Sequence, residues 1–170
     1  MSRRGGTWIQ RWRVPLGFLC GAAFIFFAHP TPRTLLIGSS VSLLGLALRA
    51  WAAGHLEKGR EVTVSGPYRL TRHPLYAGSS IMGLGFAIAS NSLAAAALAA
   101  AYLALTIGAA IRSEERHLTE KFGSAYPDYR EGRQQEIARR FSLERAMRNR
   151  EYRSMAGLAG MLALLLWKAL

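Results

Sequence analysis

Apolar residues in this chain fall into long blocks, and the charged residues lie between those blocks rather than among them. A soluble domain spreads its apolar residues at helical or strand spacing, so that each element keeps a polar face. The blocks here approach the length of about 20 residues that a helix needs to cross a bilayer. The pattern therefore predicts an all-α integral membrane protein with a single domain, 1–170.

Four crossings are expected, followed by an apolar segment of marginal length. The block from Leu75 to Ile111 is too long for one helix, and Ser90-Asn91-Ser92 divides it into two helices joined by a tight turn. We expect Asn91 to cap the second of these helices. The predicted spans are 14–29, 34–53, 74–90 and 91–111, with a possible fifth over 155–170. The fold class is therefore four to five transmembrane helices.

The distribution of Lys and Arg predicts the orientation. The segments before the first span, between the second and third, and after the fourth hold 19 of the 22 basic residues. The other two connections contain only Arg33. Basic loops are retained in the cytoplasm, so we expect a cytoplasmic N-terminus and a bacterial or archaeal inner membrane as the location.

A formal net charge of +12 suggests anionic partners. Because the basic residues flank apolar spans, anionic lipid headgroups account for them, and no nucleic acid partner is expected. Arg3-Arg4 followed by an apolar stretch resembles a signal sequence. However, Phe26 to Pro30 offers no small-x-small cleavage site, so we expect an uncleaved helix. Cys20 is alone and the four histidines are scattered, so neither a disulfide nor a metal site is predicted. The oligomeric state stays open.

The fourth helix is expected to continue beyond the membrane. Helix formers follow Arg112, and Phe122-Gly123 is a plausible stop. A helix from Ser92 to Phe122 is about 46 Å long, so it projects roughly 15 Å past a ~30 Å hydrocarbon core. Glu114 and Glu115 would then lie at or beyond the cytoplasmic interface. Residues 133–153 are predicted to form a charged helix, either on the membrane surface or in solvent.

Small residues recur at about one helical turn in the second and third spans: Gly38, Ser42 and Gly45, then Gly78, Met82 and Gly85. Such spacing lets two helix backbones approach closely. A second interpretation is that Gly83-Leu84-Gly85 leaves room for a ligand. Composition alone leaves both interpretations open.

The stretch from Gly66 to Gly78 is polar and aromatic, and it directly precedes a span. Pro74 lacks an N–H and suits the first helical turn, which places His73 at the helix cap. Exposed amides at a helix start suit an anion such as a carboxylate. Positive charges and aromatic rings surround this start: Tyr68, Arg69, Arg72 and Tyr76. The stretch is either a ligand site or an interfacial anchor.

These residues carry a resemblance. The matching pieces are Gly66-Pro67-Tyr68, Arg72-His73-Pro74-Leu75-Tyr76-Ala77-Gly78, Gly83-Leu84-Gly85, Glu114-Glu115, Leu118, Phe122-Gly123, Tyr126 and Tyr129, with Arg49 and Trp51 upstream. With them the sequence resembles the isoprenylcysteine carboxyl methyltransferase and phospholipid methyltransferase families of membrane enzymes. The resemblance covers a motif core of 49–133, about half the chain.

The resemblance implies an S-adenosyl-L-methionine-dependent methyltransferase with its cofactor pocket at the cytoplasmic face. The cofactor-binding residues that it implies are Tyr68, Arg72, His73, Tyr76, Gly78, Gly83, Gly85, Glu114, Glu115 and Tyr126. It implicates His73, Glu115 and Arg49 in catalysis, although Arg49 lies close enough to the span end to snorkel instead. A glutamate would accept hydrogen bonds from ribose hydroxyls or an ammonium group. Residues 126–129 would close over the pocket as a lid.

The implied acceptor is a lipid or lipidated molecule in the membrane, either a phospholipid amine headgroup or an isoprenylcysteine-like carboxylate. A carboxylate is already ionised, whereas an ammonium must first lose a proton to a base such as His73, Glu114 or Glu115. The chain after Tyr129 lacks the proline-terminated tail of the family, which leaves the acceptor more open than the cofactor. The alternatives are an NADPH-dependent membrane reductase of the sterol reductase type and a non-catalytic protein on the same scaffold.

Overall fold

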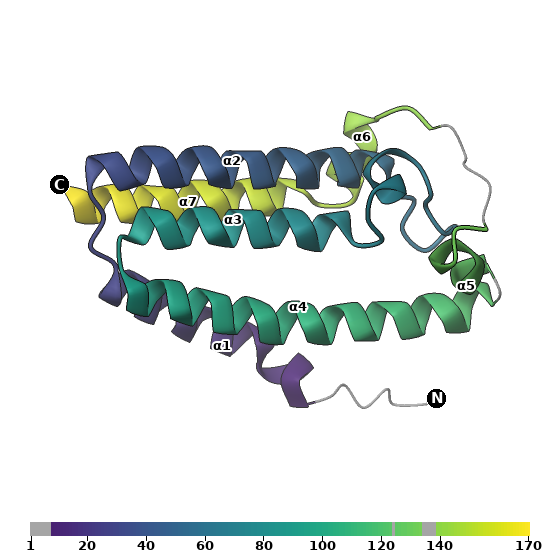
Figure 1. The fold of residues 1–170 in the computed structure, drawn as a ribbon, viewed down its shortest axis with the longest axis horizontal. Coiled ribbons are helices and arrows are strands. Elements are labelled where there is room, and N and C mark those ends of the chain that lie inside the picture. Colours follow the sequence, from purple (N-terminus) through teal and green to yellow (C-terminus); the bar gives the residue numbers. More distant parts are fainter. Residues whose placement is uncertain (1–7, 124, 134–138) are drawn as a thin grey trace.

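The computed structural model describes residues 8–123, 125–133 and 139–170, with side chains from Pro15 onward (Figure 1). Every regular element in these ranges is helical, which confirms the predicted all-α class. The elements are α1 (Trp8–Phe27), α2 (Pro32–His55), the 3₁₀ helix η1 (Gly66–Arg69), α3 (Pro74–Ser90), α4 (Leu93–Phe122), α5 (Ala125–Arg130), α6 (Leu143–Arg148) and α7 (Tyr152–Ala169).

Two of the described helices, α2 and α4, are long and apolar enough to cross a membrane, and α1 contains a shorter apolar stretch, Pro15–Phe27. Large apolar side chains on these helices point outward. Leu36 and Leu105, for example, are 70% and 72% exposed. Extended apolar surface of this kind suits contact with lipid better than contact with water. Four or five crossings, and the direction of insertion, stay predictions.

The helices run lengthwise, with α2, α3 and α7 side by side and α4 along the other side of α3 (Figure 1). Glycines bring α2 and α3 into backbone contact. A Cβ added to Gly38 would lie 2.4 Å from the Gly85 carbonyl oxygen, and one added to Gly45 would lie 2.6 Å from the Gly78 carbonyl oxygen. The small-residue pattern in these two helices therefore serves close helix packing, as one of the two interpretations held.

The turn between α3 and α4 corrects one expectation. The cap of α4 is Ser92, whose hydroxyl accepts from the Ala95 amide at 3.3 Å, and not Asn91. Asn91 instead ends α3 in the left-handed region, with φ of 49°, which asparagine tolerates better than most residues. Its side chain donates to the His29 carbonyl at 3.2 Å. The tight turn thus uses Asn91 as a C-cap and leaves capping of α4 to the next residue.

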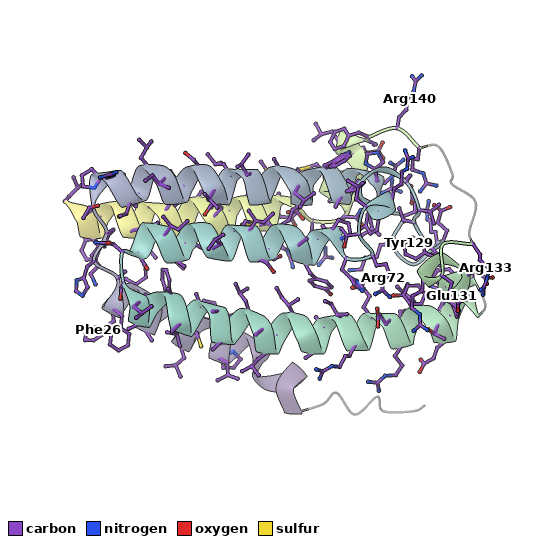
Figure 2. All side chains as sticks on the ribbon, in the orientation of Figure 1. Phe26, Arg72, Tyr129, Glu131, Arg133 and Arg140 are labelled. Carbon is purple, nitrogen blue, oxygen red and sulfur yellow. The ribbon has the colours of Figure 1, made fainter. Side chains whose placement is uncertain are left out.

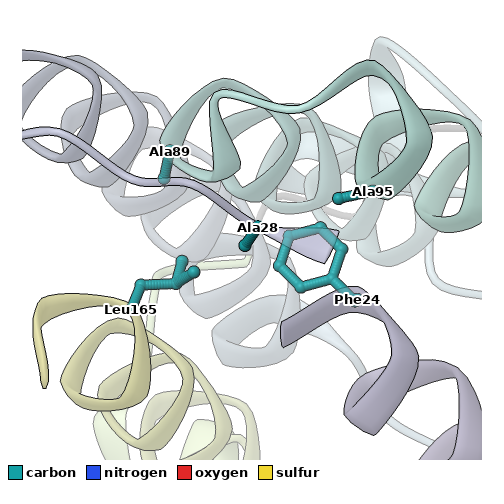
Figure 3. Packing of buried hydrophobic residues seen from close by; sticks show 5 residues of the cluster. All are labelled: Phe24, Ala28, Ala89, Ala95 and Leu165. Carbon is teal, nitrogen blue, oxygen red and sulfur yellow. The ribbon is translucent and has the colours of Figure 1, made fainter. Parts of the chain in front are cut away.

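The end of the bundle that carries this turn is closed by a small apolar core. Phe24, Ala28, Ala89, Ala95 and Leu165 pack together there (Figure 3). Close by, the Lys168 ammonium donates to the carbonyls of Ile25 and Phe26, the latter at 2.8 Å. A cation at the last carbonyls of a helix is favourable. This contact ties α7 to the end of α1.

The predicted charged helix over 133–153 is wrong. Residues 139–142 are not helical, and helix resumes only in the six-residue α6; residues 134–138 lie outside the described ranges. Ser142 starts α6 anew by accepting from the Arg145 amide at 3.3 Å. Arg145 then reaches across to Glu57 at 2.8 Å, and the Phe141 ring covers Gly54. Tertiary contacts to the end of α2 therefore fix this segment.

Candidate functional site

The Glu115 carboxylate, near the C-terminal end of α4, is contacted by side chains from the start of α3 and from α5. Glu115 Oε1 accepts from the Tyr126 hydroxyl at 3.2 Å and is hydrogen-bonded to His73 Nε2 at 3.1 Å. Arg72 Nη1 lies 3.7 Å from the same oxygen. We call Arg72, His73, Glu115 and Tyr126 the Glu115 cluster. In Figure 2, Arg72 lies at the opposite end of the molecule from Phe26.

The start of α3 positions the histidine of this cluster. Pro74 occupies the first helical turn and His73 is the N-cap, as the sequence predicted. The amides of Tyr76 and Ala77 donate to the His73 carbonyl at 3.1 and 3.0 Å, so these two donors are already used within the chain. The Tyr76 ring lies 5.9 Å from the imidazole, between ring centroids. The cap thus holds the His73 ring toward α4, and it leaves fewer amides for an anion than the sequence suggested.

Helix α5 covers the cluster. The chain turns back after Gly123, which has φ of 55° and ends α4 as predicted. Tyr126 is then 4% exposed and packs against Val62 and Val64 from the loop that follows α2. The Tyr129 hydroxyl donates to the Tyr68 carbonyl at 2.6 Å. Val62 and Val64 were not predicted to belong to this site, because their only signal in the sequence is a short alternation of apolar residues within a loop.

Hydrogen bonding and burial fix the protonation states around the cluster. The hydrogen bond from His73 lowers the pKa of Glu115, with smaller contributions from Tyr126 and Arg72. Burial raises the pKa of Tyr126, which the neighbouring Glu115 carboxylate raises further. Burial also raises the pKa of Tyr68, followed by the charge of Glu114. The carboxylate therefore remains an acceptor and the two phenols remain donors at neutral pH.

Arg49, a predicted catalytic residue, lies elsewhere. Its Nε and Nη2 donate to Glu151 at 2.8 and 3.1 Å, and Nη2 also donates to Ser154 at 2.9 Å. Its Nη1 donates to the Leu75 carbonyl at 3.1 Å and to the Ser79 hydroxyl. A guanidinium has five N–H donors, and all five are used. These contacts make Arg49 a brace between helices and not a snorkelling residue, and its role in catalysis stays a prediction.

The three predicted cofactor glycines contact neighbouring helices. An added Cβ would lie 2.6 Å from Arg49 Cγ at Gly78, 2.2 Å from the Ser42 hydroxyl at Gly85, and 2.1 Å from a Leu103 methyl at Gly83. Gly78 and Gly85 thus face α2, and Gly83 faces α4. Helix packing accounts for Gly78 and Gly85. Gly83, together with Arg49, also lines a cavity of about 380 Å³ that includes no member of the Glu115 cluster.

The described helices form a bundle that carries a hydrogen-bonded carboxylate, histidine and tyrosine at one end, and this cluster is a candidate ligand site. Residues 34–125 match the phospholipid methyltransferase family. The chain therefore belongs to this family of membrane methyltransferases, as the resemblance predicted. The matched region contains the whole Glu115 cluster except Tyr126, and it excludes Glu151 and α7.

Two curated relatives carry names from metal resistance. The chain is 34% identical over 129 residues to the cobalt-zinc-cadmium resistance protein CzcN of Cupriavidus metallidurans, which is 71% of this chain and 57% of that protein. It is 33% identical over 96 residues to the nickel-cobalt-cadmium resistance protein NccN of Alcaligenes xylosoxydans, which is 53% of this chain and 45% of that protein. The chain thus spans about half the length of these relatives. No solved structure matches it significantly.

Proposed function

We propose that this chain is an S-adenosyl-L-methionine-dependent methyltransferase that acts on a membrane-associated acceptor. The site would face the cytoplasm of a bacterial or archaeal inner membrane that the chain crosses four or five times. The observation that carries the proposal is the Glu115 carboxylate, held by His73 at 3.1 Å and Tyr126 at 3.2 Å within a chain of the phospholipid methyltransferase family.

The chemistry of the cluster fits this cofactor. S-adenosyl-L-methionine presents ribose hydroxyls and an ammonium group as donors, and a carboxylate as acceptor. Glu114 and Glu115 supply anionic acceptors, and Arg72 supplies a cation. When bound, the cofactor supplies a methyl group activated by the sulfonium.

The residues of the chain would bind, orient and exclude water. His73, Tyr126 and Arg72 all contact Glu115 Oε1. These contacts would hold the carboxylate in place, and Oε2 would then accept from the ligand. Helix α5 would exclude water from the site, and exclusion of water strengthens every charge interaction within it. Methyl transfer is an in-line displacement at the sulfonium methyl group, and positioning of the two reactants supplies much of its rate.

The acceptor would be a phospholipid amine headgroup or an isoprenylcysteine-like carboxylate. For an amine, one of His73 and Glu115 would take the ammonium proton before transfer. For a carboxylate, no base is required.

The names of the two relatives suggest a link to metal tolerance. The described residues contain no group of three or more His, Cys, Asp and Glu side chains that could hold a metal ion. We therefore propose that any contribution of this chain to metal tolerance comes from methylation of a membrane component, and not from metal binding.

Thermal unfolding of the detergent-solubilised chain tests the cofactor. S-adenosylhomocysteine should raise the melting temperature, and NADPH should not. Glu115→Gln should abolish the shift, whereas Glu120→Gln, an exposed position on the same helix, should keep it. Stabilisation by NADPH alone would favour the reductase alternative. Stabilisation by neither compound would favour a non-catalytic protein.

Incubation with a radiolabelled methyl donor and a membrane extract tests the reaction. Label in the organic lipid fraction that resists base would identify an amine acceptor, and base-labile label would identify a methyl ester. Binding of S-adenosylhomocysteine without any transfer of label would reject the catalytic proposal.

A further inference from the structure

The segment 139–153, which includes α6, carries an exposed surface at the C-terminal end of α2. Figure 1 shows α6 beside the last turns of α2, on the side of α2 that faces away from α3 and α4. Helix α2 is one of the described helices that are long and apolar enough to cross a membrane. If α2 crosses the bilayer, the segment therefore lies beside the bundle at the level where α2 leaves the lipid.

The inner face of this segment is fixed against α2. Arg145 donates to Glu57 at 2.8 Å. The Asn149 side-chain amide donates to the carbonyls of Ala53 and Leu56, both at 2.9 Å. These contacts hold α6 in one rotation about its own axis, so the structure determines which of its side chains face outward.

One part of the outward face is apolar. Leu143 and Met147, one helical turn apart, are 68% and 48% exposed. Phe141 and Trp51 are also exposed, and the ring of His55 lies between them, with its centroid 6.2 Å from each of theirs. Aromatic side chains are enriched where a bilayer meets water. The apolar part of this face thus has the composition of an interfacial surface.

The rest of the outward face is basic. Arg148 follows Met147 by about 100° around the helix, so charge adjoins the apolar part. Arg139 is paired with Glu61 and, like Arg145, is matched within the chain. The side chain of Arg140 points away from the bundle (Figure 2). The exposed charged residues of the segment are Arg140, Glu144, Arg148, Arg150 and Arg153.

We propose that the outward face of 139–153 lies on an anionic bilayer surface, with Leu143 and Met147 in the interface and the exposed arginines at lipid phosphates. An anionic bilayer complements both parts of this face, because its interface takes up apolar side chains and its headgroups attract cations. A protein partner would have to displace the lipid beside α2. The proposal rests on the proposed crossing of the membrane by α2, and not on methyl transfer.

The experiment places the full chain in phosphatidylcholine nanodiscs, with or without added phosphatidylglycerol. Leu143→Cys in a Cys20→Ala background carries a nitrobenzoxadiazole dye, and lipids with a nitroxide just below the headgroup act as quenchers. The dye at Leu143→Cys should be quenched, and phosphatidylglycerol should increase the quenching. The same dye at Glu120→Cys, an exposed position near the C-terminal end of α4, should be quenched in neither lipid.

Charge variants test the anionic partner. An arginine near an anionic bilayer contributes about fivefold to association with it. Arg148→Gln should therefore lower the phosphatidylglycerol-dependent quenching about fivefold, whereas Glu144→Gln should keep or increase it. Arg33→Gln, at an exposed arginine of the opposite end of α2, is the matched control and should change nothing. Melting temperatures in the same nanodiscs show whether each variant is folded.

Absence of quenching at Leu143→Cys in both lipids would overturn the proposal. So would quenching that neither phosphatidylglycerol nor Arg148→Gln changes. A dye at Leu44→Cys, an exposed position midway along α2, tests the crossing by itself with a nitroxide deep in the acyl chains. If Leu44→Cys is quenched and Leu143→Cys is not, the proposal fails alone. If Leu44→Cys is not quenched, the proposed crossing fails, and this proposal fails with it.

Discussion

The guanidinium of Arg49 binds both carboxylate oxygens of Glu151, at 2.8 and 3.1 Å, across 102 positions of sequence. The pair joins α2 to the start of α7, and the Glu151 side chain is 5% exposed. Because Glu151 lies outside the region that matches the family, the pair attaches the last helix to the family core. A buried charge is tolerated only when it is paired and hydrogen-bonded. Arg49 and Glu151 neutralise each other and are hydrogen-bonded to each other.

Glu151→Ala should destabilise the chain by about 3–5 kcal/mol, because it leaves the Arg49 charge buried and uncompensated. Thermal unfolding in detergent measures the loss. Glu144→Ala, at an exposed position of α6, is the control and should change stability little. The double variant Arg49→Met with Glu151→Leu should recover most of the loss. A double variant that is less stable than Glu151→Ala would contradict this account.

Gly85→Ala should destabilise the bundle by about 1–3 kcal/mol, because the new methyl group would overlap α2. The added Cβ would lie 2.2 Å from the Ser42 hydroxyl and 2.5 Å from the Gly38 carbonyl. Gly108→Ala is the matched change on α4, where an added Cβ meets no atom within 4 Å. It should be neutral or stabilise by up to about 1 kcal/mol through helix propensity. Melting temperatures that shift in the same direction for both variants would argue against the packing role.

Hydropathy and helix-end residues predicted the helices well, because both signals depend only on residues that are close together in the sequence. Pro74 and Gly123 mark helix ends by their own backbone chemistry, and the structure places helix ends there. The error at Asn91 has the same origin. Asparagine suits both a cap and a left-handed turn, and only the geometry of the two-residue connection selects between them.

Pairs that are distant in sequence were not accessible to the same reasoning. His73 and Glu115 are 42 positions apart, and family resemblance, not spacing, suggested that they share a site. No sequence pattern relates Arg49 to Glu151, so the brace that this pair forms between two helices was not predicted. The charged stretch over 133–153 was misinterpreted for the same reason, because Arg145 pairs with Glu57 and does not form part of a continuous helical face.

The Glu115 carboxylate should contribute stability that depends on pH. The hydrogen bond from His73 lowers the pKa of Glu115 below its ordinary value of 4.5. The unfolded chain therefore binds a proton more readily, and the contribution is full above pH 4.5 and disappears as pH falls through the lowered folded pKa. The side chain is 32% exposed, so the contribution should be about 1 kcal/mol or less. The difference in melting temperature between wild type and Glu115→Gln, measured from pH 7 to pH 3, should shrink toward zero. A difference that grows on acidification would contradict the assignment.

The position of α5 over the Glu115 cluster should depend on the Tyr129 hydroxyl. The Tyr129 hydroxyl donates to the Tyr68 carbonyl at 2.6 Å, so Tyr129→Phe leaves a buried acceptor without its partner. Such a loss costs about 1–3 kcal/mol, and the cost falls on the closed position of α5. Amide hydrogen exchange of residues 125–130 should therefore accelerate about tenfold, while exchange along α3 stays unchanged. Tyr152→Phe, an exposed position on α7, should leave both rates as they are. If Tyr129→Phe leaves exchange in α5 unchanged, the apolar contacts of Tyr126 with Val62 and Val64 hold the helix by themselves.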